Sequence, residues 1–393
     1  LMATRILDFP YDSIPQHLDG LTGYDRVLML VRVEGIPVGQ AVVPVRDGKV
    51  IQAELRAELR RQVAHTAADS IARRNMMPDS PTGTLLSATV AVCTRERPDD
   101  LVRCLDALGK LPDLGQELLV IDNNPSTERT RLVVKQYPRV RYVCEPRRGL
   151  DNARNRALQE ANGEVVAFID DDAVADTGWL NALLLAFEDP RVQCVTGLTM
   201  PFEMETNAQE VFESVTGFSL RGFTRRAFQS PPLNPLAAGG VGAGANMAIR
   251  RALLEEIGPF DPALDAGTAS CSGGDHEYFT RVLRAGHRIV YEPAALNWHR
   301  HRRTWKELCD AMYGYGVGVY AAWTSSLLSG NEWGVLGLAA SWLFRAQLPR
   351  IVRALLRPSR ERPADILWAE LRGCAVGPFA YFKARRTARQ SLQ

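Results

Sequence analysis

Hydrophobic and polar positions over the first eighty residues predict two strands and a helix. Residues 26–33 and 38–45 are apolar runs separated by a turn that contains Gly and Pro, a pattern typical of paired strands. From about 51 to 74 an apolar residue recurs every fourth position, which predicts an amphipathic helix. Residues 78–83 read Pro-Asp-Ser-Pro-Thr-Gly and indicate a linker. We therefore expect residues 1–80 to form a small accessory α+β unit with a role in interaction or homo-oligomerisation.

After the linker, short apolar runs alternate with amphipathic segments. The predicted strands cover 84–93, 117–121, 140–144 and 165–169, and the predicted helices between them cover 99–108, 128–136 and a segment that begins near Leu150. Such alternation predicts a mostly parallel sheet with crossover helices, and therefore an α/β fold. Residues 196–236 show no clear period, and we expect an irregular loop there that faces an acceptor.

Three carboxylates follow the predicted strand at 165–169. Asp170, Asp171 and Asp172 would repel one another unless water or a cation compensates their charges. One interpretation is a solvated turn that caps the next helix, since acidic turns are common. The other is a cation site, because ligands of open α/β sheets bind beyond the carboxyl ends of the strands. Hard oxygen ligands there suit a divalent metal, Mn or Mg, that bridges phosphates.

Further polar residues follow other strands and helices of the same pattern. Asp122 comes directly after the strand at 117–121, where it suits a ribose hydroxyl or base amide, or a simple Asx turn. Residues 145–157 carry four arginines, which suit either phosphates or a solvated helix face. Residues 239–251 are rich in glycine, so the backbone must approach another group closely, but the spacing is not that of a P-loop. Asp275 opens a predicted helix, a position that is usually an N-cap only.

Length, charge and cysteine content narrow the class of function only slightly. The 393-residue chain has a net charge of +2, which gives no reason to expect a nucleic-acid partner. Its seven cysteines are scattered without Cys-x-x-Cys spacing, so we expect free thiols in a reducing cytoplasm. The first residues show no apolar signal-peptide segment, which also favours a cytoplasmic location.

The C-terminal part, residues 303–393, is expected to be helical. Its apolar segments at 319–328 and 333–344 are shorter than the roughly 20 residues that a membrane-spanning helix needs. From Arg345 onward, Arg and Lys outnumber Asp and Glu by 11 to 3. Aromatic residues beside arginines suggest peripheral contact with an anionic membrane surface, and the alternative is a packed helical cap with a solvated basic face.

Several of these segments, in this order, resemble the inverting family-2 glycosyltransferases with the GT-A fold. The matching residues are 93–98, 120–123, Glu145-Pro146, Gly149-Leu150, 153–155, 168–172, 244–246, 258–261, Gly274-Asp275, and His299 or His301. The resemblance covers about residues 86–302 and is nearest to a bacterial, rhamnosyltransferase-like group. It implies a GT-A (nucleotide-diphospho-sugar transferase) domain at 84–302, with a Rossmann-like, mostly parallel sheet.

The same resemblance implies roles for individual residues. Asp275 falls on the catalytic base, Asp172 on the metal ligand, and His299 (preferred to His301) on a histidine that completes the metal shell. The implied substrate-binding residues are Thr94, Arg95, Glu96, Arg97, Asp122, Arg154, Asp170, Asp171, Gly244, Asn246 and Gly274, with Arg154 facing the diphosphate. The family usually has Glu where this chain has Gly274, and we expect His276 and Glu277 to compensate for it.

The function implied is transfer of a sugar from a UDP-, GDP- or dTDP-linked donor to an acceptor hydroxyl, which belongs to a lipid-linked or glycan acceptor. Two other functions are open. A nucleotidyltransferase shares the α/β sheet and acidic metal site, although residues 94–98 lack the glycine-rich loop of that class. A non-catalytic sugar-nucleotide- or glycan-binding protein is favoured by the glycine at 274.

Overall fold

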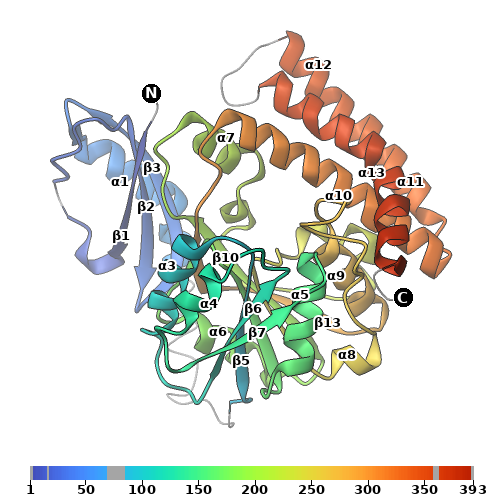
Figure 1. Ribbon diagram of the computed structural model, residues 1–393. Helices are drawn as coiled ribbons and strands as arrows, with labels where there is room; N and C mark the ends of the chain where they lie inside the picture. Colours follow the sequence, from blue (N-terminus) through green and yellow to red (C-terminus); the bar gives the residue numbers. More distant parts are fainter. Residues whose placement is uncertain (1–2, 16, 69–84, 357–362, 391–393) are drawn as a thin grey trace.

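A computed structural model describes residues 3–15, 17–68, 85–356 and 363–390, in which helices surround a central sheet of nine strands (Figure 1). These strands are β5 (Ala88–Thr94), β6 (Glu117–Asn123), β7 (Val140–Glu145), β8 (Val165–Asp170), β9 (Ala173–Ala175), β10 (Val192–Pro201), β11 (Arg226–Phe228), β12 (Asn246–Arg250) and β13 (Arg288–His299). Their order is β11-β13-β10-β12-β8-β5-β6-β7, and β9 pairs with β13. The predicted α/β class is confirmed.

The parallel half of the sheet brings polar residues to one edge. Strands β8, β5, β6 and β7 are parallel, and α3 (Pro98–Leu108), α4 (Arg129–Val134) and α5 (Leu150–Glu160) connect them as crossovers. In this register Thr94 pairs with Asp122, and Cys93 pairs with Asp170. The carboxyl ends of neighbouring strands therefore present Thr94, Asp122 and Asp170 at the same edge, where ligands of such sheets bind.

The other half of the sheet departs from the sequence prediction. Residues 196–236, expected to be an irregular loop, contain most of β10 together with α7 (Asn207–Thr216), η3 (Phe218–Arg221) and β11. Strand β10 is almost wholly buried between β12 and β13. Its Gly197 is required by a close approach, since a Cβ there would lie 2.1 Å from the carbonyl oxygen of Ala295. Strand β13 has twelve residues and ends at His299.

Helices cover both faces of this sheet. Helices α3 and α6 (Trp179–Leu185) pack on one face, where Trp179 is fully buried, and α5 and α9 (Gly274–Arg284) pack on the other. On that second face the rings of Phe260 and Tyr278 stack with centroids 3.9 Å apart. The remaining short elements of this part are η2 (Ala186–Glu188), η4 (Pro235–Gly240) and α8 (Leu253–Glu256). The two apolar layers fix the positions of the strand ends.

The N-terminal residues form a second sheet that packs on the first. It contains β1 (Thr4–Pro10), β2 (Arg26–Val33), β3 (Ile36–Arg46) and β4 (Lys49–Val50), with the turn η1 (Tyr11–Ser13) and the helix α1 (Gln52–Gln62). Strand β1, which the sequence did not predict, pairs in parallel with β2. One sheet face packs on α1, and Leu28 and Leu30 of the other face pack against Leu198 and Met200 of β10. The predicted linker and the end of the predicted helix lie outside the described residues.

The C-terminal region is helical, and its two long helices lie side by side (Figure 1). It contains α10 (Trp305–Gly330), α11 (Gly334–Trp342), the π-helical turn η5 (Leu343–Gln347), α12 (Leu348–Leu356) and α13 (Ala364–Gln390). Glycines allow α10 and α13 to touch, since a Cβ on Gly316 would lie 2.1 Å from the Glu370 carbonyl oxygen. Within the described residues, no helix combines the length and apolar character needed to cross a membrane.

Candidate active site

The acidic end of β8 faces a histidine from β13. Strand β8 is buried along Val165–Ile169 and meets solvent only at Asp170, after which the chain turns into the short β9. Strand β9 pairs antiparallel with β13, with Ala173 opposite His299. Because the backbone oxygen of Asp172 also accepts from Arg300 N at 3.0 Å, the turn is held against the end of β13. The pairing brings a carboxylate and an imidazole together although 127 residues separate them in the chain.

Asp170, Asp172 and His299 form a group with the donor atoms of a metal site. One ligand atom from each residue lies within 4.8 Å of the others, and His299 Nε2 is 3.1 Å from Asp172 Oδ1. Burial acts to raise the pKa of Asp172, but His299, Arg97 and Arg302 beside it hold that pKa well below its usual range. Two carboxylates and one imidazole suit Mn²⁺ or Mg²⁺, so the residues fit the predicted metal.

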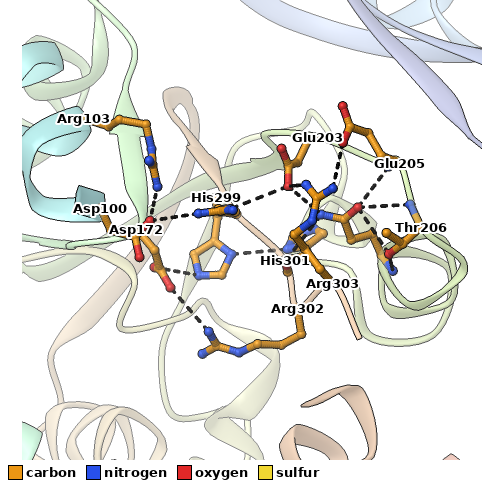
Figure 2. A network of polar contacts seen from close by, with 12 residues as sticks. Asp100, Arg103, Asp172, Glu203, Glu205, Thr206, His299, His301, Arg302 and Arg303 are labelled. Carbon is orange, nitrogen blue, oxygen red and sulfur yellow. Dashed lines mark hydrogen bonds and ion pairs between the residues drawn. The ribbon is translucent and has the colours of Figure 1, made fainter. Parts of the chain in front are cut away.

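His301, the alternative metal ligand, contacts the side of the His299 ring that faces away from Asp172 (Figure 2). The Nδ1 atoms of the two rings are 3.2 Å apart, and His301 Nε2 is 2.9 Å from Glu213 Oε2 on α7. The hydroxyl of Ser219 donates to the other oxygen of Glu213. Burial lowers the pKa of His301. His301 is therefore placed to orient the His299 ring, a role that outer residues commonly have around metal ligands.

Asp171 points away from this group and toward β5. Its Oδ2 accepts from the Thr94 hydroxyl at 2.7 Å, and its Oδ1 is 3.2 Å from Arg97 Nη1. Burial and the neighbouring charge of Asp172 raise the pKa of Asp171 to about 7. Arg97 also reaches Asp172, at 3.0 Å. Thr94 and Arg97, both predicted donor-binding residues, thus hold the acidic turn in place.

The loop after β5 is shaped by Glu96. This residue has a positive φ of 56°, and its carboxylate accepts from the backbone N–H groups of Ser126 and Thr127 at 2.6 and 3.1 Å. These hydrogen bonds, led by that of Ser126, lower the pKa of Glu96 to about 2. The loop after β5 is thereby tied to the loop after β6, and Arg95 of the first loop is exposed. Glu96 is placed to shape a ligand pocket by holding two loops.

Asp122 is a buried carboxylate with one oxygen unoccupied. Its Oδ2 accepts from the Tyr142 hydroxyl at 2.8 Å, whereas Oδ1 is buried without a hydrogen-bond partner. Burial raises the pKa of Asp122. A buried acceptor without a partner is costly, so this oxygen is suited to a donor group on a ligand.

Arg154 lies in a buried cluster of carboxylates. Its Nη1 donates to Asp151 Oδ1 at 3.0 Å and also pairs with Asp265, and the Arg154 side chain is only 4% exposed. The first pair is an i, i+3 pair on α5. Burial acts to lower the pKa of Arg154, but the charges of Asp265 and Asp151 raise it well above its usual range. Arg154 therefore balances buried protein charge, which differs from the implied direct contact with a diphosphate.

Asp275 lies beside this cluster and is not the N-cap of its helix. Helix α9 begins at Gly274, and the N-cap is Gly273 in a left-handed conformation. Asp275 Oδ2 accepts from the backbone N–H of Gly244 at 2.8 Å, and its Oδ1 accepts from its neighbour His276 N at 2.7 Å. Gly244 is required here because a Cβ would lie 2.5 Å from Arg154 Nη2. The simple capping interpretation is thus wrong, and the glycine-rich segment contacts this carboxylate directly.

The glycine at 274 has a steric reason. A Cβ on Gly274 would lie 2.0 Å from Asp151 Oδ2, an oxygen that is buried without a hydrogen-bond partner. The carboxylate of Asp151 thus occupies the space that a side chain at 274 would need. His276 and Glu277, expected to compensate for this glycine, have other partners: His276 Nε2 contacts the Leu236 carbonyl, and Glu277 pairs with Arg281.

Asn246 lies inside the sheet, where it pairs with Ile169 of β8, the residue before Asp170. Its side chain is fully buried, accepts from Trp179 Nε1 at 2.8 Å, and donates to the carbonyl oxygens of Leu198 and Ala295 at 2.9 Å each. These bonds join α6, β10 and β13 to β12. The side-chain oxygen and nitrogen of Asn246 are both hydrogen-bonded within the protein, whereas the family resemblance implied that they contact the substrate.

Strand pairing places Asp275 near the metal group. Asn246 of β12 pairs with Ile169 of β8, which directly precedes Asp170, and Gly244, two residues before Asn246, donates its N–H to Asp275. The charge of Arg154 interacts with both Asp275 and Asp170. Burial and the negative charges of Asp275, Asp170 and Asp172 raise the pKa of Tyr315 on α10 to about 12. The site is therefore the carboxyl edge of the sheet, with α10 beside it.

Sequence reasoning missed several residues of this site, namely Asp151, Glu213, Asp265, Arg302 and Tyr315. Only Asp151 carries a local signal, because it precedes Arg154 by three positions on a predicted helix. Arg302 directly follows the candidate ligand His301, and the other three come from segments to which the sequence assigned no chemistry, so tertiary contacts alone bring those three to the site.

Several known proteins are similar to this chain. Residues 89–258 match the family model described as glycosyl transferase family 2. The chain is similar to the glycosyltransferase AglE of Haloferax volcanii, with 24% identity over 68% of this chain and 84% of the relative. It is also similar to the pre-mycofactocin glycosyltransferase of Mycobacterium tuberculosis, with 26% identity over 69% of this chain. The chain spans about half, 53%, of that second relative.

A solved structure shows the same fold. The mannosyltransferase PcManGT from Pyrobaculum calidifontis, described in complex with GDP-Man and Mn2+, aligns with a TM-score of 0.51 and 17% identity. The alignment covers 78% of this chain and 92% of that chain. The GT-A fold expected from the sequence is thereby confirmed.

Proposed function

We propose that this chain, a glycosyltransferase with a glycosyl transferase family 2 domain at residues 89–258, moves a sugar from a nucleoside-diphosphate donor to an acceptor hydroxyl with inversion. The observation that carries this proposal is the pairing of a three-residue metal group with a separate carboxylate, Asp275, at one sheet edge. The similarity to glycosyltransferases argues against the two alternatives considered from the sequence, a non-catalytic binding protein and a nucleotidyltransferase.

The donor side of the proposed site is the end of β5, β6 and β8. Asp122 offers an unpaired buried oxygen to the nucleoside, and the Glu96 loop shapes the wall beside it. Asp170, Asp172 and His299 would hold the divalent metal. When bound, the metal would supply positive charge against the diphosphate leaving group. A manganese ion in the PcManGT complex supports this proposal for a protein of the same fold.

The acceptor side of the proposed site is Asp275. Its carboxylate, oriented by the N–H of Gly244, takes the proton of the acceptor hydroxyl. The acceptor oxygen forms a bond to the anomeric carbon, and the bond from that carbon to the diphosphate oxygen breaks with its electron pair on the leaving group. Attack from the face opposite the leaving group inverts the anomeric centre.

Asp275→Asn tests this assignment. Loss of a general base lowers turnover by about 10²–10⁴-fold, whereas the donor site is unchanged. We expect slow transfer in a glycosyltransferase assay together with wild-type donor binding by calorimetry. Asp310→Asn, at an exposed position of α10, is the control and should keep wild-type turnover. Near-wild-type turnover of Asp275→Asn would rule out the base assignment.

Three finer points of the proposal rest on the sequence resemblance, namely a rhamnosyltransferase-like specificity, a UDP-, GDP- or dTDP-linked donor, and a lipid-linked or glycan acceptor. Two others rest on the sequence itself: a cytoplasmic location on the scattered cysteines, and homo-oligomerisation on the N-terminal unit. A thermal-shift screen of sugar nucleotides with manganese would identify the donor, because a ligand that binds the folded state raises the melting temperature. Contact with a membrane is a separate proposal that rests on the C-terminal helices.

A further inference from the structure

We propose that the outer faces of α11, η5, α12 and α13 together form a docking surface for an anionic phospholipid bilayer, on which the enzyme lies without crossing it. We call this surface the C-terminal face. It goes beyond the transfer reaction, since it concerns where the folded enzyme is held and involves none of the residues of the active site.

Large apolar side chains are exposed on every element of the C-terminal face. Phe379 of α13 is 76% exposed, Leu356 of α12 is 77% exposed, and Phe344 of η5 is 65% exposed. The other exposed members are Trp333 just before α11, Leu336, Val352, Leu355, Trp368, Val376 and Phe382. Exposed aromatic groups at this density mark a binding surface more often than a free one.

Packing of α13 on α10 fixes this exposure. A Cβ on Gly373 would lie 2.1 Å from the Tyr313 carbonyl oxygen, and a Cβ on Gly377 would lie 2.6 Å from the Tyr320 side chain. The side of α13 with these glycines must therefore face α10. Trp368, Phe379 and Phe382 lie on the opposite side and cannot turn inward unless the two helices separate.

The charges among these apolar groups are almost all positive. Between 334 and 390, the described residues contain eight Arg or Lys and two acids. Of the two acids, Glu370 is half-buried and burial raises its pKa, whereas Asp365 is exposed and accepts from Trp305 Nε1 at 2.6 Å, so the basic residues far outnumber the exposed acids. Cations beside apolar groups match the headgroup and acyl layers of an anionic bilayer.

A cationic hollow lies at the end of α13. It has a volume of about 390 Å³ and is lined by Phe382, Arg385, Arg386, Arg389 and Gln390. Guanidinium groups bind phosphate oxygens in bidentate geometry, and the ring of Phe382 suits the glycerol and acyl region beside them. The hollow therefore suits the phosphate of a lipid headgroup.

Charge favours a bilayer over a second copy of the chain as the occupant. Two C-terminal faces in contact would bring many like charges together with few acids to compensate them, and such contacts are unfavourable. An anionic bilayer compensates the cations and accepts the aromatic side chains at the same time.

Vesicle co-sedimentation of the full chain tests the proposal. We expect binding to vesicles of phosphatidylcholine mixed with phosphatidylglycerol, weaker binding to phosphatidylcholine alone, and release by added salt. Arg385→Gln/Arg386→Gln/Arg389→Gln should weaken binding on the order of 100-fold, since each basic residue near the surface contributes about fivefold. Phe379→Ser/Phe382→Ser should weaken it at least about tenfold.

A matched control removes three exposed cations elsewhere. Arg131→Gln/Lys135→Gln/Arg139→Gln, on and after α4, makes the same change in net charge and should bind vesicles as the wild type does. Circular dichroism would establish that each variant is folded. Equal binding of wild type to both vesicle types would overturn the proposal, as would equal weakening in the control. A dimer in sedimentation that the Phe379→Ser/Phe382→Ser variant abolishes would overturn it in favour of a second copy.

Discussion

Two arginines at the carboxyl edge of the sheet each bridge a pair of aspartates, in opposite environments. Arg97 contacts Asp171 and Asp172, and 42% of its side chain is exposed. Arg154 contacts Asp151 and Asp265, and 4% of its side chain is exposed. Both arginines pair with two carboxyl groups. The two clusters therefore differ mainly in how far the arginine is exposed to solvent.

This difference separates a replaceable counter-ion from a permanent one. Arg97 is partly exposed although Asp172 is buried, so Arg97 can move into solvent when another cation takes its place beside Asp172. Breaking a buried pair costs about 3–5 kcal/mol because it leaves an uncompensated charge. The first cluster is therefore suited to exchange an arginine for a metal, and the second to hold the neighbourhood of Asp275 in one arrangement.

Removing Asp172 should have the largest effect. Loss of residues that support metal ligands typically costs 10–100-fold in affinity, so loss of a ligand itself should cost more than about 100-fold. We expect Asp172→Ala to abolish manganese-dependent donor binding, measured by calorimetry with and without the metal. Asp171→Asn is the control, because Asp171 faces Thr94 and lies outside the metal group, and it should keep the dependence on manganese. Unchanged manganese-dependent binding in Asp172→Ala would contradict the metal assignment.

Removing Arg154 should reduce the free energy of unfolding by about 3–5 kcal/mol, since Asp151 and Asp265 would lose their buried partner. Burial raises the folded-state pKa of both carboxyl groups above the unfolded value. These two groups therefore stabilise the folded state fully at pH values below their unfolded pKa, and this stabilisation is lost as the pH rises through their folded-state pKa. Arg154→Met should accordingly be less destabilised at about pH 5 than at about pH 8 in urea unfolding. An equal loss at both pH values would argue that these carboxylates do not titrate with folding.

A side chain at 274 should have a smaller effect. The added Cβ of Gly274→Ala meets Asp151, which Arg154 holds in place, and overpacking of this kind typically costs about 1–3 kcal/mol. Thermal unfolding should show the loss, and Asp151→Ala/Gly274→Ala should recover part of it. Gly240→Ala adds a methyl group where nothing lies within 4 Å and should change stability little. Equal effects of the two glycine substitutions would contradict the steric explanation.

Removing Arg97 should have the smallest effect on stability. Arg97→Gln removes a partly exposed arginine, whose place beside the two buried carboxylates solvent or a cation can take, so the free energy of unfolding should change by about 1 kcal/mol or less. Manganese should bind at least as tightly as in the wild type, because no arginine then competes for Asp172. A loss comparable to that of Arg154→Met would show that Arg97 is a permanent partner of the acidic turn.

The sequence by itself determined the parallel half of the fold and the identity of most candidate groups. Runs such as 165–169 are long enough and apolar enough to be strands wherever they lie, and a carboxylate that follows such a run must emerge at its end. Strand β10 could not be read in the same way, because Gly197 interrupts its apolar run and weakens the local signal, and pairing with β12 and β13 compensates for that glycine.

Only the tertiary structure decided which of the candidate residues act together. It set His299 against Asp172 and His301 behind it, turned Asp171 toward Thr94, buried Asn246 in the sheet, and filled the space beside Gly274 with Asp151. The physical reason is that local sequence fixes which side chains emerge at a strand end. Burial, charge balance and contact depend on groups from distant segments, which meet only when the sheet is assembled.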